Sequence, residues 1–100
     1  MSLPASIRER LKIPVIAAPM FLVSGPELVI AACQSGIIGS FPAMNCRSSE
    51  DFAGWMTQID AATGPHTAPY AVNMGLARMR GERLIADMDI CRKFKPEFVI

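Results

Sequence analysis

Residues 13–20 (Ile-Pro-Val-Ile-Ala-Ala-Pro-Met) constrain the fold most, because they form a short apolar run with no polar alternation. A run of this kind is typical of a strand buried on both faces, as in a parallel sheet. Pro19 has no backbone N–H, so it marks the exit of this strand. In parallel α/β folds the ligand site lies at the carboxyl ends of the strands. We therefore expect a ligand beside Ala18, Pro19 and Met20.

Segments with strand-like and helix-like patterns alternate along the rest of the chain. A short helix over residues 3–12, with Ser6 as its N-cap, is expected before the first strand. The later expected strands cover residues 37–41, 69–74 and 96–100. The later expected helices cover residues 26–35, a stretch between Ser48 and Gly64, and residues 82–94. Each connection is long enough for a helical crossover, so we expect the strands to pair in parallel.

Local signals predict where the helices end and which faces they bury. Gly36 is expected to end the helix at residues 26–35, and Ser48 with Asp51 resembles a capping box at the start of the next. The helix at residues 26–35 is apolar almost all round, which predicts burial on more than one side. The apolar stripe of the following helix is Phe52, Trp55, Met56 and Ile59. The stripe expected on the last helix is Ile85, Met88, Cys91 and Phe94.

This order of elements predicts an α/β fold with parallel strands and helical crossovers. Two architectures compete: a doubly wound open sheet and the first half of a (β/α)8 barrel, or TIM barrel. The expected units complete neither, and a parallel sheet that stopped at residues 96–100 would expose an apolar edge. We therefore expect residues 1–100 to be the N-terminal portion of a single domain that continues past Ile100.

Composition and charge exclude several classes of function. The chain is 51% apolar and 19% charged with a net charge of +1, and it carries no basic stripe of the kind that binds nucleic acid or anionic lipid. Its three cysteines lack Cys-x-x-Cys spacing, which disfavours a disulfide framework and a zinc site. We expect a cytoplasmic protein without nucleic-acid or membrane partners, in which homo-oligomerisation could cover the sheet edge.

The common catalytic and nucleotide-binding motifs are absent. No Gly-x-Gly-x-x-Gly follows the first strand, and the sequence has no Walker loop, Gly-x-Ser-x-Gly elbow or His-Glu-x-x-His. His66 lies in a helix-to-strand connection, opposite the expected site, and is interpreted as an ordinary loop histidine. Cys46 lies on a loop of the expected site face, where a thiol could lie near a ligand, but without a base or cation shown to be close to it a reactive thiol is not indicated. Arg78 and Arg80 could reach an anionic ligand, but solvated charge is favoured.

Asn73 closes the third expected strand, at the same edge of the sheet as residues 18–20. A planar heteroaromatic ligand could use this edge, because Ala18 lacks bulk, Pro19 fixes φ and Met20 offers its amide N–H. The Asn73 carboxamide suits a ring carbonyl or ring nitrogen. The structural alternatives are that residues 18–20 are a plain strand exit and that Asn73 is a turn former.

Four stretches resemble the nitronate monooxygenases, flavoenzymes formerly called 2-nitropropane dioxygenases. These stretches are residues 11–20, Ser-Gly-Pro-Glu-Leu at 24–28, Gly-Ile-Ile-Gly-Ser at 36–40 and Tyr-Ala-Val-Asn-Met at 70–74, with Ala31-Ala32 between them. The resemblance implies an FMN-binding (β/α)8 barrel that oxidises alkyl nitronates with O2. Ala18, Pro19 and Met20 match the first FMN-contacting segment of the family, and Asn73 matches its FMN-contacting asparagine.

The resemblance assigns no catalytic residue and no metal ligand within residues 1–100. The Gly-His-Ala-Gly histidine segment of the family and its phosphate-binding loops lie later in the barrel, and Phe21 stands where many members have a small residue. Two other functions stay open. One is an FMN-dependent enoyl-acyl-carrier-protein reductase type of enzyme, built alike but using a nicotinamide. The other is a non-catalytic fragment or interaction module.

Overall fold

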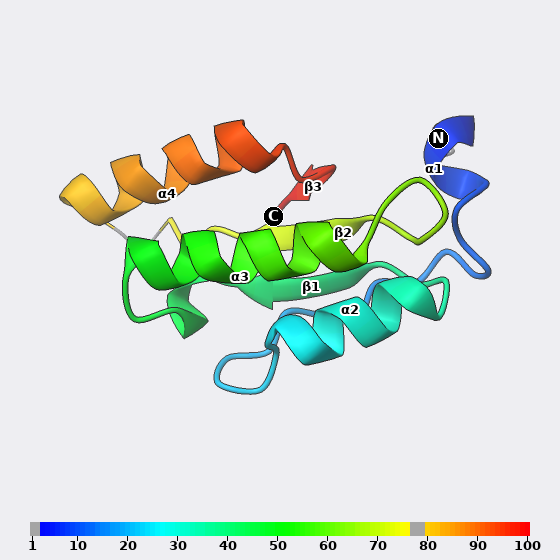
Figure 1. Ribbon diagram of the computed structural model, residues 1–100, viewed down its shortest axis with the longest axis horizontal. Helices are drawn as coiled ribbons and strands as arrows, with labels where there is room; N and C mark the ends of the chain where they lie inside the picture. The colour runs from blue at the N-terminus through cyan, green and yellow to red at the C-terminus, as the bar shows by residue number, and fades with distance from the viewer. Residues whose placement is uncertain (1–2, 77–79) are drawn as a thin grey trace.

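The computed structural model describes residues 3–76 and 80–100, which form a parallel three-stranded sheet with helices packed against it (Figure 1). The strands are β1 (Gly39–Pro42), β2 (Tyr70–Asn73) and β3 (Phe98–Val99), and they lie side by side in chain order. Phe41 of β1 pairs with Val72 of β2, which pairs with Val99 of β3. The expected mixed α/β fold with parallel strands is confirmed at this level.

Four α-helices and one 3-10 turn are present in the described residues. They are α1 (Ala5–Arg8), α2 (Pro26–Gln34), η1 (Ala43–Asn45), α3 (Ser49–Ala62) and α4 (Gly81–Phe94). The predicted end of α2 is confirmed, since Gly36 adopts a φ of 91°. The predicted start of α3 is also confirmed, because the Asp51 N–H donates to Ser48 Oγ over 3.1 Å. The first helix is shorter than predicted, and Ser6 lies inside it while Pro4 is its N-cap residue. Among residues 3–76 and 80–100, none of the helices has both the length and the apolar character that a membrane-spanning segment needs.

The predicted first strand at residues 13–20 is present only as a partial edge. Ile16 forms one parallel bridge with Ile38, whose carbonyl accepts from the Ala17 N–H over 2.8 Å. Ile13 is 53% exposed and Ile16 is 44% exposed, so the prediction of a strand buried on both faces is wrong. The segment lies beside β1, but no further strand pairs with its other side among the described residues.

One core joins the sheet to α2, α3 and α4. Phe41 and Val72 are paired across the strands and therefore point to the same face. The side chains that pack with them come from all three helices and include Val29, Cys33, Phe52, Met56, Ile59 and Cys91. The three helices thus cover one face of the sheet, and the predicted burial of the α3 stripe is confirmed at Phe52, Met56 and Ile59.

Of two further predictions of helix burial, the one for α2 is wrong and the one for α4 is confirmed in part. In α2 the buried residues are Val29, Ala32 and Cys33, whereas Leu28 is exposed, so this helix buries one side only. In α4 the predicted stripe is confirmed at Cys91, which is buried, and at Met88 and Phe94, which pack against the core, but Ile85 is exposed and Asp87 is fully buried instead. A buried carboxylate at this position is tolerated because it has two hydrogen-bond donors, described below.

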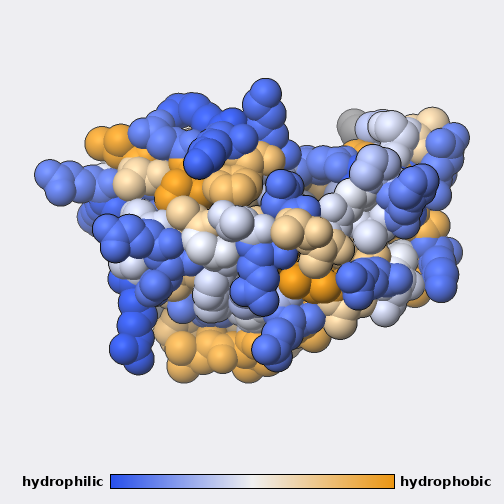
Figure 2. Space-filling model, viewed as in Figure 1, coloured by the Kyte–Doolittle hydropathy of each residue, from blue (hydrophilic) through white to orange (hydrophobic). Residues whose placement is uncertain are grey.

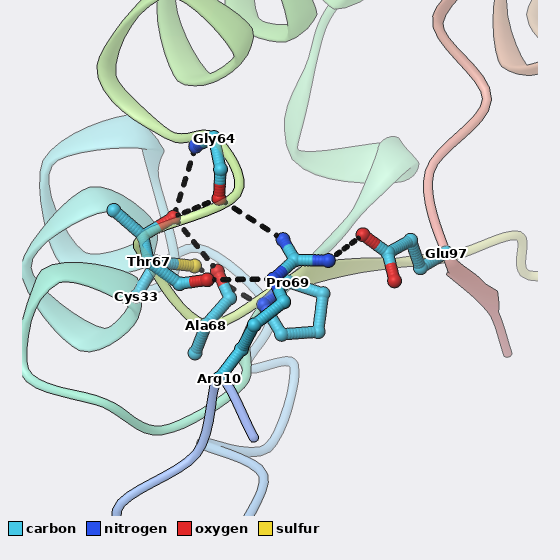
Figure 3. Close-up of polar contacts among 7 residues, drawn as sticks. All are labelled: Arg10, Cys33, Gly64, Thr67, Ala68, Pro69 and Glu97. Atoms are coloured by element: carbon cyan, nitrogen blue, oxygen red, sulfur yellow. Dashed lines mark hydrogen bonds and ion pairs between the residues drawn. The ribbon is translucent and has the colours of Figure 1, made fainter. Parts of the chain in front are cut away.

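Arg10 joins the N-terminal segment to the amino ends of the strands through hydrogen bonds and an ion pair (Figure 3). Its Nε donates to Thr67 O over 2.9 Å and its Nη2 donates to Gly64 O over 3.2 Å. Its Nη1 forms an ion pair with Glu97, which precedes β3. One side chain thus joins the N-terminal segment, the α3–β2 loop and the entry to β3. The carboxyl ends of the strands lie at the opposite end of the sheet.

Candidate functional site

An open groove of about 550 Å³ lies at the carboxyl ends of the strands. Its lining includes Pro19, Phe21, Pro42, Met44, Asn73 and Leu76. Pro42 and Asn73 are paired in register as the last residues of β1 and β2, which explains why both reach the same groove. Of the four residues predicted to contact a ligand, Pro19 and Asn73 therefore lie together in one cavity.

Ala18 and Met20, the other two predicted residues, are exposed beside the groove. The Met20 N–H donates to Ser24 Oγ over 2.8 Å. The sequence suggested this N–H as a donor to a ligand, but in this conformation it is already paired within the chain. Ser24 itself is buried, so the pairing is part of the folded loop.

Asn45 holds the loop that contains Met20 and Phe21, and sequence reasoning did not single it out. Its Oδ1 accepts from the Leu22 N–H over 2.9 Å, while its Nδ2 donates to Met20 O over 3.0 Å and to Ser24 O over 2.8 Å. The carboxamide holds Leu22 at a φ of 65°, a left-handed conformation that is unusual for a bulky residue. An asparagine in a loop is common, so no local signal distinguished this one.

Asn73 contributes the polar side chain in the described lining of the groove. It is half-buried, and its Nδ2 donates to Ile100 O over a long distance of 3.4 Å. A hydrogen bond of that length is weak, so a ligand acceptor could replace it at little cost. The backbone around it is firmly held, because the Met74 N–H donates to Ile100 O over 2.8 Å.

Cys46 is not a reactive thiol. It is buried, and this burial raises the pKa of the Cys46 thiol to about 12, against a smaller lowering by Arg83. Burial also raises the pKa values of Cys33 and Cys91. All three therefore stay neutral at physiological pH, and a neutral thiol is a poor nucleophile. Cys33 on α2 and Cys91 on α4 are buried and act as small core hydrophobes.

The remaining candidates lie away from the groove or outside the described residues. His66 is exposed in the loop between α3 and β2, near the amino end of β2, as expected for a surface histidine. Arg80 is the N-cap residue of α4, and Arg78 lies outside the described residues.

The groove is chemically simple: apolar walls and one carboxamide. No charged side chain is among its described lining residues, so the described part of the site holds no general acid or base and no cation for a phosphate. Walls of this kind suit a planar apolar ring, and the Asn73 carboxamide can donate to or accept from a polar ring edge. The described lining therefore offers one hydrogen-bonding side chain in an apolar groove and no cationic partner for an anionic group.

Comparison with known proteins adds no assignment. No protein-family model matches this chain, and no curated protein matches its sequence. The case for a function thus depends on the groove and on the motifs around it.

Proposed function

We propose that this chain is the N-terminal portion of a (β/α)8 barrel that continues past Ile100. Support comes from the strand order, since residues 13–17, β1, β2 and β3 are neighbours in chain order. In a doubly wound sheet the order reverses at a switch point and helices cover both faces. Here the order is sequential and α2, α3 and α4 share one face, as the strands and helices of a barrel do.

The function that this groove supports best is FMN-dependent oxidation of alkyl nitronates by O2. One observation carries the proposal: Pro19 and Asn73, which match FMN-contacting positions of the nitronate monooxygenases, line the same groove. When bound, FMN would take electrons from the substrate and pass them to O2. The chain's own residues would hold the ring, with Pro19, Pro42 and Met44 excluding water from it and Asn73 binding its polar edge.

Flavin binding by the full-length protein tests this function. We expect the purified protein to carry FMN, to lose its yellow colour when a nitronate is added without oxygen, and to regain it in air. Bleaching by NAD(P)H alone would instead show the reductase type of enzyme. A full-length protein that neither contains nor binds flavin would contradict both, and so would a coding sequence that ends at Ile100.

Replacing Asn73 tests the cofactor assignment at the level of one side chain. Asn73→Ala removes the polar group of the described lining, and we expect FMN affinity to fall about tenfold, the value of one hydrogen bond to a ring atom. Gln58→Ala is the matched control, because it removes an exposed carboxamide of α3 outside this groove. Titration of the apoprotein with FMN measures both. Equal affinity in Asn73→Ala and wild type would show that Asn73 does not bind the cofactor.

A further inference from the structure

Asp87 of α4 is a fully buried carboxylate outside the groove. Arg83 Nε, one turn earlier, donates to its Oδ2 over 2.7 Å, and Ser49 Oγ at the start of α3 donates to its Oδ1 over 2.7 Å. A buried charge is stable only when it is paired in this way. Asp87 and its two donors thus link α4 to the start of α3, which follows the η1 turn.

Arg83 also reaches the η1 turn. Its Nη2 donates to Ala43 O over 3.1 Å and to Cys46 O over 3.0 Å. These two carbonyls flank Met44 and Asn45, so the guanidinium fixes the turn from both ends. The planar guanidinium is suited to this, since it holds Asp87 with one nitrogen and both carbonyls with another.

The same turn contributes one lining residue, Met44, and one residue, Asn45, that holds the loop carrying the lining residue Phe21. Met44 lines the groove directly, and its Sδ lies 3.0 Å from where a Cβ on Gly75 would be, so it packs closely on the chain after β2. Asn45 holds the backbone at Met20, Leu22 and Ser24, as described above. We propose that the Arg83–Asp87 pair is a positioning device, which sets the shape of the groove through the η1 turn and Asn45. This inference concerns the chain without ligand and so does not depend on the proposed function.

Amide hydrogen exchange in the full, ligand-free chain tests it. Arg83→Lys keeps a cation beside Asp87 but lacks the planar fork that reaches the carboxylate and both carbonyls from separate nitrogens, so we expect the Leu22 N–H to exchange about tenfold faster. The Ala68 N–H, which donates to Cys33 O at the opposite end of the sheet, should keep its wild-type rate. Arg92→Lys is the matched control, because Arg92 forms an exposed pair with Asp89 on the same helix. It should change neither rate.

A double-mutant cycle with Asn45→Ala separates positioning from general stabilisation. If Arg83 acts through Asn45, Asn45→Ala alone speeds Leu22 exchange, and adding Arg83→Lys speeds it no further. Independent effects, or a wild-type Leu22 rate in Arg83→Lys, would overturn the inference. If Arg83→Lys unfolds the chain, Asp87→Asn takes its place in the cycle, because it weakens the pair without leaving a buried charge. The same two outcomes then support or overturn the inference. Because no ligand is used, a failure to bind FMN would leave this test unaffected.

Discussion

At the scale of the residue, the Tyr70 hydroxyl is a buried side-chain group whose hydrogen bonding is not satisfied by the described residues. It is buried at the amino end of β2 and has no hydrogen-bond partner in the part of the chain that the structure describes. Burial raises the pKa of Tyr70 above its ordinary value, and the nearby Asp60 carboxylate raises it further. The phenol therefore stays neutral, and its lost hydration is uncompensated. A buried polar group left in this state costs about 1–3 kcal/mol.

Tyr70→Phe should therefore stabilise the chain by about 1 kcal/mol, measured by urea unfolding at neutral pH. The pH dependence should change as well. Above about pH 10 the unfolded tyrosine ionises and the folded one does not, so wild-type stability falls as pH rises. The variant lacks this contribution and should decline less steeply. A loss of stability at neutral pH in Tyr70→Phe would show that the hydroxyl is satisfied in solution.

At the scale of the element, the packing of α2 on β1 depends on the absence of a side chain at Gly39. A Cβ at this position would lie 2.5 Å from Val29 O and 2.9 Å from Val29 Cα. Both atoms belong to the backbone of α2 and cannot rotate away. The glycine thus sets how closely the helix approaches the strand.

We expect Gly39→Ala to destabilise the chain by about 2 kcal/mol, because the helix must move away from the sheet. Gly54→Ala is the control: Gly54 lies inside α3 with nothing within 4 Å of its would-be Cβ. There alanine should stabilise by about 0.5–1 kcal/mol through helix propensity. Thermal and urea unfolding of both variants measure the difference, and a stable Gly39→Ala would contradict the close packing.

The elements also show what sequence could predict. The cap at Ser48 and the stripe from Phe52 to Ile59 are properties of consecutive residues, and both were found. The burial of Asp87 depends on donors from Arg83 and from a second helix, so a pattern that counts apolar residues assigned Ile85 to the core instead. Asn45 was missed for the same reason, since its three partners lie in a distant loop.

The candidate site was predictable only where strand ends defined it. Pro19 and Asn73 both end apolar runs, and the rule that parallel strands present their carboxyl ends together placed them in one groove. Pairing of the Met20 N–H with Ser24 Oγ depends on the folded shape of the loop, which no residue pattern encodes. Likewise, residues 13–16 have the composition of a buried strand, but burial needs a neighbour on each side.

At the scale of the whole molecule, apolar side chains remain exposed on the loop before α2 and at both edges of the sheet, including Val99 at the β3 edge. Figure 2 shows apolar surface gathered along the lower side of the view, over the loop before α2, where Phe21, Leu22 and Val23 are exposed. Ile13 and Val15 are exposed along the free edge beside β1. An apolar edge with unpaired backbone groups is prone to associate with other chains.

We therefore expect residues 1–100, expressed alone, to associate as concentration rises, and Ile13→Lys to raise the concentration at which they stay monomeric. A charge on an edge strand opposes pairing with a second strand. Gln58→Lys adds the same charge on an exposed position of α3 and should have a much smaller effect. Light scattering over a concentration series measures both. Equal effects of the two lysines would show that net charge, and not the edge, controls association.

The sequential strand order also determines how this chain can fold during synthesis. Each strand of the order β1-β2-β3 pairs with the one made just before it. When a new strand leaves the ribosome, its partner and the helix between them are already outside, so no pairing has to wait for a distant segment. A sheet of this kind can grow by addition at one edge, in the direction of translation.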